Sequence, residues 1–304
     1  MKRIESIAII GMGALGLLFG DMLQRDGKLS VGFIADAARL ERYKDEPICV
    51  NGAQKRFDFL PAGTKDAPAD LVIFAVKATA LDGAMEDAAG YVGERTVLLS
   101  LLNGITSEGL LEARFGRDRV VHCVAQGMDA TRRGRKLVYS KPGQLCVGLP
   151  DDRPGDGLEA VTALFDRVGI PYTVESDIRH RMWSKFMLTV GVNQVVMVRE
   201  GNYGTVQVPG EAREQMIAAM REVIALSGLE GVAVTEDDLT YYVNLIDTLS
   251  PEGMPSMRQD GLARRKSEVE LFSGTVCRLA SGHGLDVPVN RQLYDAIRAM
   301  EAQY

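Results

Sequence analysis

The chain contains 304 residues, with 35 Lys and Arg against 41 Asp and Glu, a formal net charge of −6 and 46% hydrophobic residues. This composition is typical of a globular protein, so a disordered, collagen-like or small disulfide-rich chain is excluded, and the length favours two domains over one. Because the charge balance is acidic and the Lys/Arg clusters are short, we expect no nucleic-acid partner.

The cysteines and histidines are scattered. None of the four cysteines belongs to a C-x-x-C pair, and none of the three histidines stands at metal-ligand spacing from another. We therefore expect no metal site, and cysteines that stay reduced as they do in the cytoplasm.

The N-terminus imitates a secretory signal peptide, because Lys2-Arg3 precedes a weakly interrupted apolar stretch from Ile7 to Phe19. Glu5 interrupts the basic region, glycines interrupt the apolar one, and no small-residue cleavage site follows. No other stretch approaches the ~20 apolar residues of a membrane span. We expect a cytoplasmic protein without a membrane partner.

Short β-rich runs alternate with helical stretches in the first half of the chain, which predicts an α/β domain with a parallel sheet and crossover helices. The first run leads into a helix that extends through Arg25. The candidate buried strands cover residues 7–10, 31–35, 71–76, 96–101 and 120–124.

Two turn signals predict hairpins, which would make this sheet mixed. Asn51-Gly52 follows the extended run 48–50, and Lys141-Pro142-Gly143 separates residues 137–139 from 145–149. Residues 151–157 resemble a linker, but a helix from Leu158 and an extended segment at 171–175 resume the α/β alternation. We therefore place the domain boundary near Ser176, between domains of residues 1–176 and 177–304.

The second domain is predicted to be all-α, because its apolar residues recur with a period of 3.6. Ser256 with Gln259 has the spacing of a capping box that would open the longest helix, and Gly282 and Gly284 would close it. The expected helices cover residues 179–198, 211–227, 237–248, 256–283 and 291–302.

A glycine motif joins the first predicted strand to the first helix. Gly11, Gly13 and Gly16 have G-x-G-x-x-G spacing. In such a loop the first glycine makes a tight turn, the second lets a pyrophosphate approach the backbone, and the third lets helix and strand pack closely. The motif predicts a dinucleotide site, with a structural turn that binds no ligand as the alternative.

Polar residues follow two of the predicted strands. Ligands of open α/β sheets bind beyond the carboxyl ends of the strands. Lys77 ends one strand and Asn103-Gly104 follows the next, so we expect both to project toward the crevice at the glycine loop. A lysine that merely ends a strand in solvent is the alternative for Lys77.

The first helix of the second domain carries a polar stripe. Lys185, Thr189 and Asn193 are four residues apart and therefore line one helix face. The remaining residues are mostly apolar, which predicts a buried helix. Desolvation would lower the pKa of a buried lysine, which could then donate a proton to a carbonyl oxygen as hydride reaches the carbon. A lysine that extends to the surface is the alternative.

Over nearly its whole length the chain resembles the ketopantoate reductase (2-dehydropantoate 2-reductase) family. The resemblance implies NADPH-dependent reduction of 2-dehydropantoate to pantoate in pantothenate biosynthesis. It also implies a dinucleotide-binding Rossmann-like domain over 1–176 and a helical substrate or closure domain over 177–304. The matching blocks are residues 7–16, Val76-Lys77-Ala78, Leu102-Asn103-Gly104, 182–186, 191–194, Tyr203-Gly204 and 255–268.

The resemblance further implies roles for single residues. Lys185 matches the general-acid lysine of the family. The implied substrate contacts are Asn103, Thr189, Asn193 and Ser256. The implied cofactor contacts are Gly11, Met12, Gly13, Ala14, Leu15, Gly16, Lys77, Asn103 and Glu268.

Two departures from the family pattern leave the substrate open. Thr189 stands where many members have a second asparagine, and its hydroxyl lacks the reach and the second donor of an amide. Tyr203 stands where some members have an asparagine that contacts the substrate. A related reductase of another small 2-oxo acid is therefore the alternative. A non-catalytic nicotinamide-nucleotide sensor is a third possibility, which the polar stripe disfavours.

The sequence gives conflicting indications on the cofactor. Asp36 lies where the fingerprint expects an acid that accepts the ribose 2′-hydroxyl, which favours NAD(H). The family tends toward NADP(H), often with an arginine at the end of the second strand, where Ala35 stands here. Arg39 and Arg42 follow closely enough to supply the charge. We expect NADP(H), with Asp36 turned partly away and NAD(H) as the alternative. The expected partners are a small 2-oxo acid and, with oligomeric state left open, a second copy of the chain.

Overall fold

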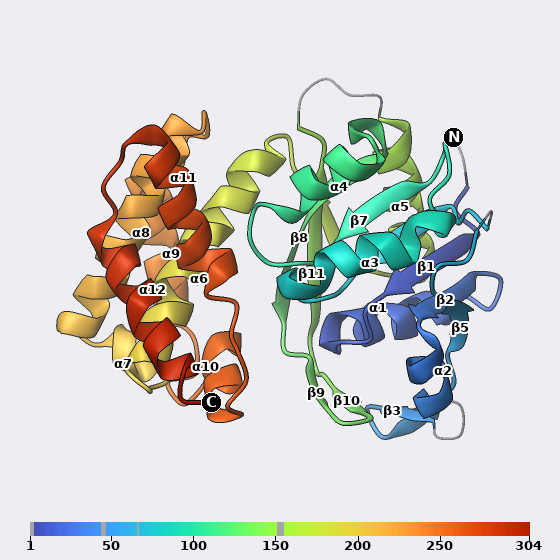
Figure 1. The fold of residues 1–304 in the computed structure, drawn as a ribbon, viewed down its shortest axis with the longest axis horizontal. Helices are drawn as coiled ribbons and strands as arrows, with labels where there is room; N and C mark the ends of the chain where they lie inside the picture. The colour runs from blue at the N-terminus through green and yellow to red at the C-terminus, as the bar shows by residue number, and fades with distance from the viewer. Residues whose placement is uncertain (1–2, 44–46, 66, 151–154) are drawn as a thin grey trace. The chain divides into compact units, whose positions relative to one another are not determined.

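The computed structural model describes residues 3–43, 47–65, 67–150 and 155–304. The chain divides into two compact units, Met1–Ile178 and Arg179–Tyr304, and the predicted boundary near Ser176 lies close to this division. The first unit is α/β and the second is helical, as predicted (Figure 1). Residues 151–154 of the predicted linker lie outside the described residues.

The main sheet of the first unit has the strand order β12-β11-β8-β7-β6-β1-β2-β5. Its neighbouring strands are parallel, except that β11 runs antiparallel to β8. All five predicted buried strands are confirmed. The strands are β1 Ser6–Ile10, β2 Ser30–Ala35, β5 Asp58–Pro61, β6 Leu71–Phe74, β7 Val97–Ser100, β8 Val120–Met128, β11 Pro142–Gly148 and β12 Tyr172–Val174.

Helices cover both faces of this sheet. Ile7 and Ile9 of β1 share a core with α1 (Ala14–Gln24) and α5 (Asp156–Val168). Ala8 and Ile10 face the opposite core, formed with α3 (Leu81–Ala88) and α4 (Ser107–Phe115). Helix α2 (Ala37–Tyr43) follows β2. Because both faces are covered, a ligand can approach this sheet only at its edges, and in open α/β sheets it binds beyond the carboxyl ends of the strands.

A smaller sheet, with the order β4-β3-β10-β9, shares a core with α1. The predicted hairpin at Asn51-Gly52 is confirmed, with φ values of 48° and 85° that suit a tight two-residue turn. It belongs to this second sheet and not to the main one. The strands are β3 Ile48–Val50, β4 Ala53–Lys55, β9 Thr131–Arg133 and β10 Lys136–Val138.

The second predicted hairpin, at Lys141-Pro142-Gly143, is wrong. The strand before it, β10, pairs with β3 and β9, whereas the strand after it, β11, pairs with β8. The physical reason is the length of β8, which offers β11 a long buried partner and separates it from β10. The main sheet is nevertheless mixed, through the β8–β11 pair.

The second unit consists of helices, and four of the five predicted ones are confirmed. Among the described residues no helix is long and apolar enough to cross a membrane. The helices are α6 Ile178–Val198, α7 Gly204–Gln207, α8 Glu211–Leu229, α9 Glu236–Asp247, α10 Ser256–Leu262, α11 Thr275–His283 and α12 Pro288–Glu301, with a π-helix η4 at Glu270–Gly274.

The predicted long helix over 256–283 is wrong, because the chain leaves the helix after Leu262 and Arg264 adopts a φ of 49°. The predicted capping box is also wrong. Ser256 is the first helical residue after Pro255, and the Gln259 amide donates instead to the Met254 carbonyl at 3.2 Å. Gly284, with a φ of 66°, ends α11 as expected.

Candidate functional site

The glycine loop connects β1 to α1. Gly11 has a φ of 106°, and a Cβ there would lie 2.4 Å from the Ala75 carbonyl oxygen. A Cβ on Gly16 would lie 1.9 Å from the Gly11 carbonyl oxygen. Backbone conformation and close packing therefore require glycine at both positions, as the motif predicts.

Gly13 is different. It has an extended backbone, with φ −69° and ψ −168°, and a Cβ there would meet only the Ala75 oxygen, at 3.7 Å. Neither conformation nor packing within the unit explains the missing side chain. Gly13 also precedes the first turn of α1, which no side chain caps. Open space over an uncapped helix N-terminus fits the pyrophosphate of a dinucleotide.

Lys77 and Asn103 follow β6 and β7, which lie in that order beside β1 in the main sheet. Phe74, at the end of β6, pairs with Ile10 of β1 on one side and with Ser100 of β7 on the other. Lys77 lies three residues beyond this point and is exposed, whereas Asn103 is partly buried. The structure thus places both residues at the same sheet edge as the glycine loop.

Asp36 caps α2. Its Oδ1 accepts a hydrogen bond from the Arg39 amide at 2.7 Å, and its Oδ2 lies 3.5 Å from the Arg39 Nε. Both side chains are about half exposed. The carboxylate therefore holds the N-terminus of α2 and also partly neutralises Arg39.

The polar stripe lies on α6, which is buried over most of its length. Asn193 is 7% exposed, and the Asn193 amide has no hydrogen-bond partner among the described residues. Thr189 is 9% exposed, and its hydroxyl donates to the carbonyl oxygens of Lys185 at 3.2 Å and Phe186 at 3.0 Å. The Asn193 amide is thus available to hydrogen-bond another group, whereas the hydroxyl hydrogen of Thr189 is directed to backbone carbonyls of α6.

Lys185 is partly exposed, so the prediction that it is buried is wrong. It lies in the first half of α6, before the fully buried stretch that extends from Thr189 to Met197. A partly exposed lysine can still donate a proton.

Ser256 and Glu268 lie on either side of the break in the predicted long helix. Ser256 is exposed at the start of α10, and Glu268 is partly buried just before the π-helix η4. The Glu268 carbonyl accepts from the amides of Leu271 and Phe272 at 2.9 and 3.1 Å. A π-turn commonly marks a functional segment of a helix.

Gln194 was assigned no role from the sequence, although it is fully buried on α6. Its Oε1 accepts from the Ser273 amide of η4 at 3.2 Å, and its Nε2 donates to the Val190 carbonyl at 2.8 Å. The π-turn makes this possible, because the Val269 carbonyl accepts from Gly274 instead of Ser273. Gln194 therefore fixes the segment after Glu268 against α6. A polar residue in an otherwise apolar stretch was the only available signal.

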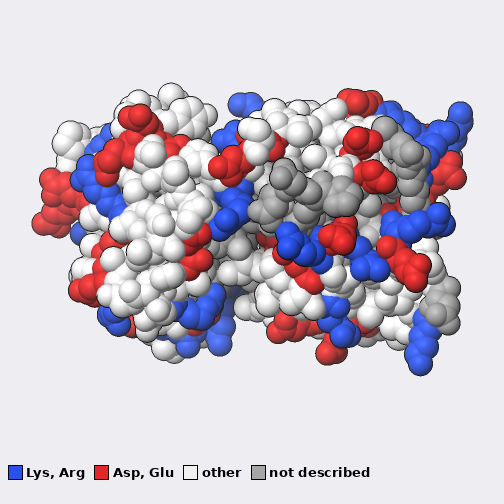
Figure 2. Space-filling view, turned by 90° about the horizontal axis from the view of Figure 1, so that it is seen from above, with Lys and Arg blue, Asp and Glu red and all other residues white. Residues whose placement is uncertain are grey.

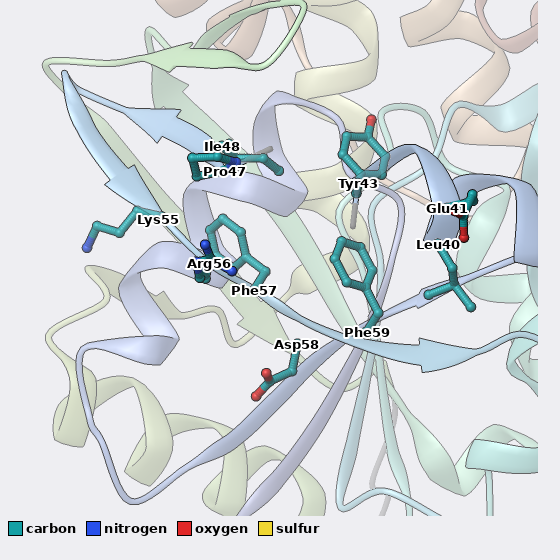
Figure 3. A pocket seen from close by; sticks show the side chains of 10 residues that line it. All are labelled: Leu40, Glu41, Tyr43, Pro47, Ile48, Lys55, Arg56, Phe57, Asp58 and Phe59. Atoms are coloured by element: carbon teal, nitrogen blue, oxygen red, sulfur yellow. The ribbon is translucent and has the colours of Figure 1, made fainter. Parts of the chain in front are cut away.

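A cavity of about 460 Å³ lies in the first unit (Figure 3). None of the predicted site residues lines it. On the face of the molecule in Figure 2, acidic and basic side chains are interspersed. The described residues include no group of three or more His, Cys, Asp or Glu side chains that could hold a metal ion. The cavity walls are residues Leu40, Glu41, Tyr43, Pro47, Ile48, Lys55, Arg56, Phe57, Asp58 and Phe59.

Two family models match the chain. One is described as ketopantoate reductase PanE/ApbA and matches residues 7–151, and the other is described as the C terminal of the same reductase and matches residues 177–301. Together they account for both units. The chain belongs to the ketopantoate reductase family. It is therefore assigned to a family of oxidoreductases.

Ketopantoate reductase relatives match over almost the whole chain. A 2-dehydropantoate 2-reductase of Archaeoglobus fulgidus is 27% identical over 303 residues, which cover 99% of each chain. One of Vibrio cholerae is 23% identical, covering 98% of this chain and 99% of the relative. These identities are too low to specify a substrate.

Solved structures share the fold. A ketopantoate reductase from Ralstonia eutropha JMP134 superposes with a TM-score of 0.84 at 23% identity, and D-mandelate dehydrogenase in complex with NADH superposes with 0.89 at 20% identity. Each comparison covers 98% of this chain and 99% of the other. A dimeric ketopantoate reductase from Staphylococcus aureus gives 0.83 at 20% identity, with the same coverage.

Proposed function

We propose that this chain is an NADPH-dependent 2-dehydropantoate 2-reductase that forms pantoate for pantothenate biosynthesis. The observation that carries the proposal is the α6 face, where a partly exposed Lys185 precedes the buried amide of Asn193 by two helical turns. A cation and an amide donor suit a 2-oxo acid, because it presents a carboxylate and a ketone oxygen.

The first unit supplies the dinucleotide site of the proposal. The amides at the uncapped start of α1 bind the pyrophosphate above Gly13, and Lys77 and Asn103 bind at the neighbouring strand ends. When bound, the nicotinamide supplies a hydride to the ketone carbon of the substrate. Glu268 is a further cofactor contact, supported by its position beside the π-turn of η4.

Lys185 is the general acid. Its ammonium group donates a proton to the ketone oxygen while the carbon gains hydride, so that the product is a neutral hydroxyl and the lysine becomes a neutral amine. Asn193 and Ser256 orient the substrate by hydrogen bonds. Thr189 presents its methyl group, because its hydroxyl hydrogen is directed to the helix backbone.

The contacts of the Asp36 carboxylate with Arg39 support the preference for NADPH. An acid that discriminates against a 2′-phosphate must point its oxygens at the ribose. One oxygen of Asp36 is instead bound to the Arg39 amide, and the other faces the Arg39 guanidinium.

A second candidate is a reductase of a different 2-oxo acid, and Thr189 favours it. The side chain is shorter and less polar than the asparagine of many family members, so the substrate site has more room and one donor fewer. D-mandelate dehydrogenase, which shares the fold, has a structure with NADH and anilino(oxo)acetate. A 2-oxo acid with an aromatic side chain therefore belongs among the test substrates.

The test measures kcat/KM for 2-dehydropantoate, phenylglyoxylate and aliphatic 2-oxo acids, each with NADPH and with NADH. We expect 2-dehydropantoate with NADPH to give the highest value. Lys185→Met should lower kcat by roughly 10²- to 10⁴-fold, the usual contribution of general acid catalysis. Lys141→Met, at an exposed position in the first unit, is the control. A Lys185→Met enzyme with wild-type kcat would refute the assigned general acid, and a preference for another 2-oxo acid would favour the second candidate.

A further inference from the structure

The buried carboxylate of Asp21 on α1 forms an ion pair with the small sheet. Asp21 of α1 is 3% exposed, and it contacts the Lys55 ammonium of β4 and the Arg25 guanidinium, both at 2.9 Å, and the Tyr139 hydroxyl at 3.3 Å. Burial alone would raise the pKa of Asp21, but hydrogen bonds from Lys55 and Arg25 outweigh it and lower the pKa. The ionised Asp21 therefore holds the sheet in a fixed position along α1.

This attachment brings Arg132 of β9 to the glycine loop. Figure 1 shows β9 and β10 leading from the main sheet toward β3 and α2. The Arg132 Nη1 donates to the Met12 carbonyl, its Nη2 donates to the Tyr43 hydroxyl at 2.7 Å, and its Nε donates to the Gly134 carbonyl at 2.8 Å. The guanidinium also lies 5.9 Å from the centre of the Tyr43 ring. Its orientation is thus fixed on three sides.

The Arg132 guanidinium has a positive charge and N–H donors that are available to a ligand. A guanidinium has five N–H donors, and three are used in the contacts above. No carboxylate among the described residues pairs with it. The group that it contacts, the Met12 carbonyl, belongs to the residue between Gly11 and Gly13, beside the uncapped start of α1. A guanidinium and a helix N-terminus at one place attract the same ligand, a phosphate.

Arg39 is less suited to this task. It lies 3.5 Å from the Asp36 carboxylate, and its side chain is 53% exposed. An exposed, already paired cation gains little from a further anion in water, whereas the half-buried Arg132 is held in place and pairs with no carboxylate of the described ranges. Arg39 is a candidate from the sequence because it follows β2 closely. Its exposure and its pairing with Asp36 in the structure make it a weaker candidate for binding a phosphate.

We propose that Arg132 is a phosphate-binding residue of the dinucleotide site, contributed by the small sheet. The proposal rests on the proposed dinucleotide-dependent function and extends it to a residue outside the glycine motif. The phosphate is either the pyrophosphate that NADH and NADPH share or the 2′-phosphate of NADPH, and the two sources give different results on substitution.

The experiment measures the dissociation constants of NADPH and NADH by direct titration without substrate. Arg132→Met should weaken binding roughly ten- to a hundredfold, the loss expected for a hydrogen bond to a charged group. Arg132→Lys keeps the charge without the fork of donors, so it should be intermediate. The matched control is Arg133→Met, because Arg133 is exposed on the same strand and points to the opposite face.

If Arg132→Met weakens the binding of both nucleotides, Arg132 contacts the pyrophosphate. If it weakens the binding of NADPH alone, Arg132 contacts the 2′-phosphate. The proposal is overturned if Arg132→Met and Arg132→Lys bind both nucleotides as tightly as Arg133→Met does. If Arg132→Met does not fold, Arg132→Lys decides the question, and wild-type affinity in that variant overturns the proposal. A wild-type chain that binds neither nucleotide would overturn the proposed function as well, so the two failures are distinguishable.

Discussion

Replacing Glu108 with glutamine should remove a large pH dependence from the stability of the first unit. Glu108 lies in the first turn of α4 and is 2% exposed. Burial, with a small contribution from the nearby Glu112, raises its pKa from 4.5 to about 7, against smaller opposing effects of hydrogen bonds such as that from the Ser107 hydroxyl at 2.9 Å. A group with this pKa is protonated in the folded protein under conditions in which it ionises in the unfolded chain.

The sign and size of the effect follow from these two pKa values. Below pH 4.5 the Glu108 carboxyl is neutral in both states and contributes no pH dependence. Between pH 4.5 and 7 the unfolded chain releases the proton while the folded unit keeps it, so the free energy of unfolding falls as the pH rises. A difference of about 2.5 pH units, at 1.36 kcal/mol per unit, amounts to about 3 kcal/mol, and the loss is complete above pH 7.

The assay must report on the first unit, because the single tryptophan, Trp183, lies in the second. Hydrogen exchange of peptides from β7 and α4, measured between pH 5 and pH 8, gives local free energies of opening. We expect the difference between wild type and Glu108→Gln to change by up to about 3 kcal/mol across this range. Glu86→Gln, at an exposed position on α3, should retain the wild-type dependence. A pH-independent difference between wild type and Glu108→Gln would refute the reasoning.

Three further predictions separate the requirements of the fold from those of a ligand. Gly16→Ala places a Cβ 1.9 Å from the Gly11 oxygen, so both the melting temperature and NADPH affinity should fall. Gly13→Ala meets no atom nearer than 3.7 Å and should keep the melting temperature while losing NADPH affinity; equal affinity in wild type and Gly13→Ala would contradict the assigned pyrophosphate site. Gln194→Leu leaves the Ser273 amide unsatisfied, so urea denaturation should show a loss of about 1–3 kcal/mol. An unchanged denaturation midpoint would show that the Gln194 contact contributes nothing.

The features that the sequence predicts well depend on short stretches of chain. The glycine loop follows from three residues within six, and a parallel strand ends where its apolar run ends, which is why Lys77 and Asn103 could be placed at the same edge. The stripe on α6 likewise follows from helical periodicity alone. The exposure of Lys185 could not be predicted in this way, because it depends on which neighbouring helices cover the first turns of α6.

The features that the sequence misses depend on contacts between distant residues. Arg132 is 120 residues from Met12, and Gln194 is 79 residues from Ser273. The expected long helix over 256–283 is also interrupted after Leu262, although the periodic pattern continues. In both pairs, Arg132 with Met12 and Gln194 with Ser273, a polar side chain hydrogen-bonds a backbone group that is distant in the sequence. A local sequence pattern does not indicate such a pair.

The distinction between an enzyme and a nucleotide sensor depends on groups that the fold does not require. Gly11, Gly16 and Gln194 are explained by packing within their own units. The open space at Gly13 is not, but a sensor would need it as much as a reductase would. The Asn193 side chain is 7% exposed, and its amide has no hydrogen-bond partner among the described residues of either unit. It lies on the helix face that also carries Lys185, and in the proposed reductase both residues would contact a substrate with a carboxylate and a ketone oxygen. A protein that only sensed the dinucleotide would gain nothing from that arrangement.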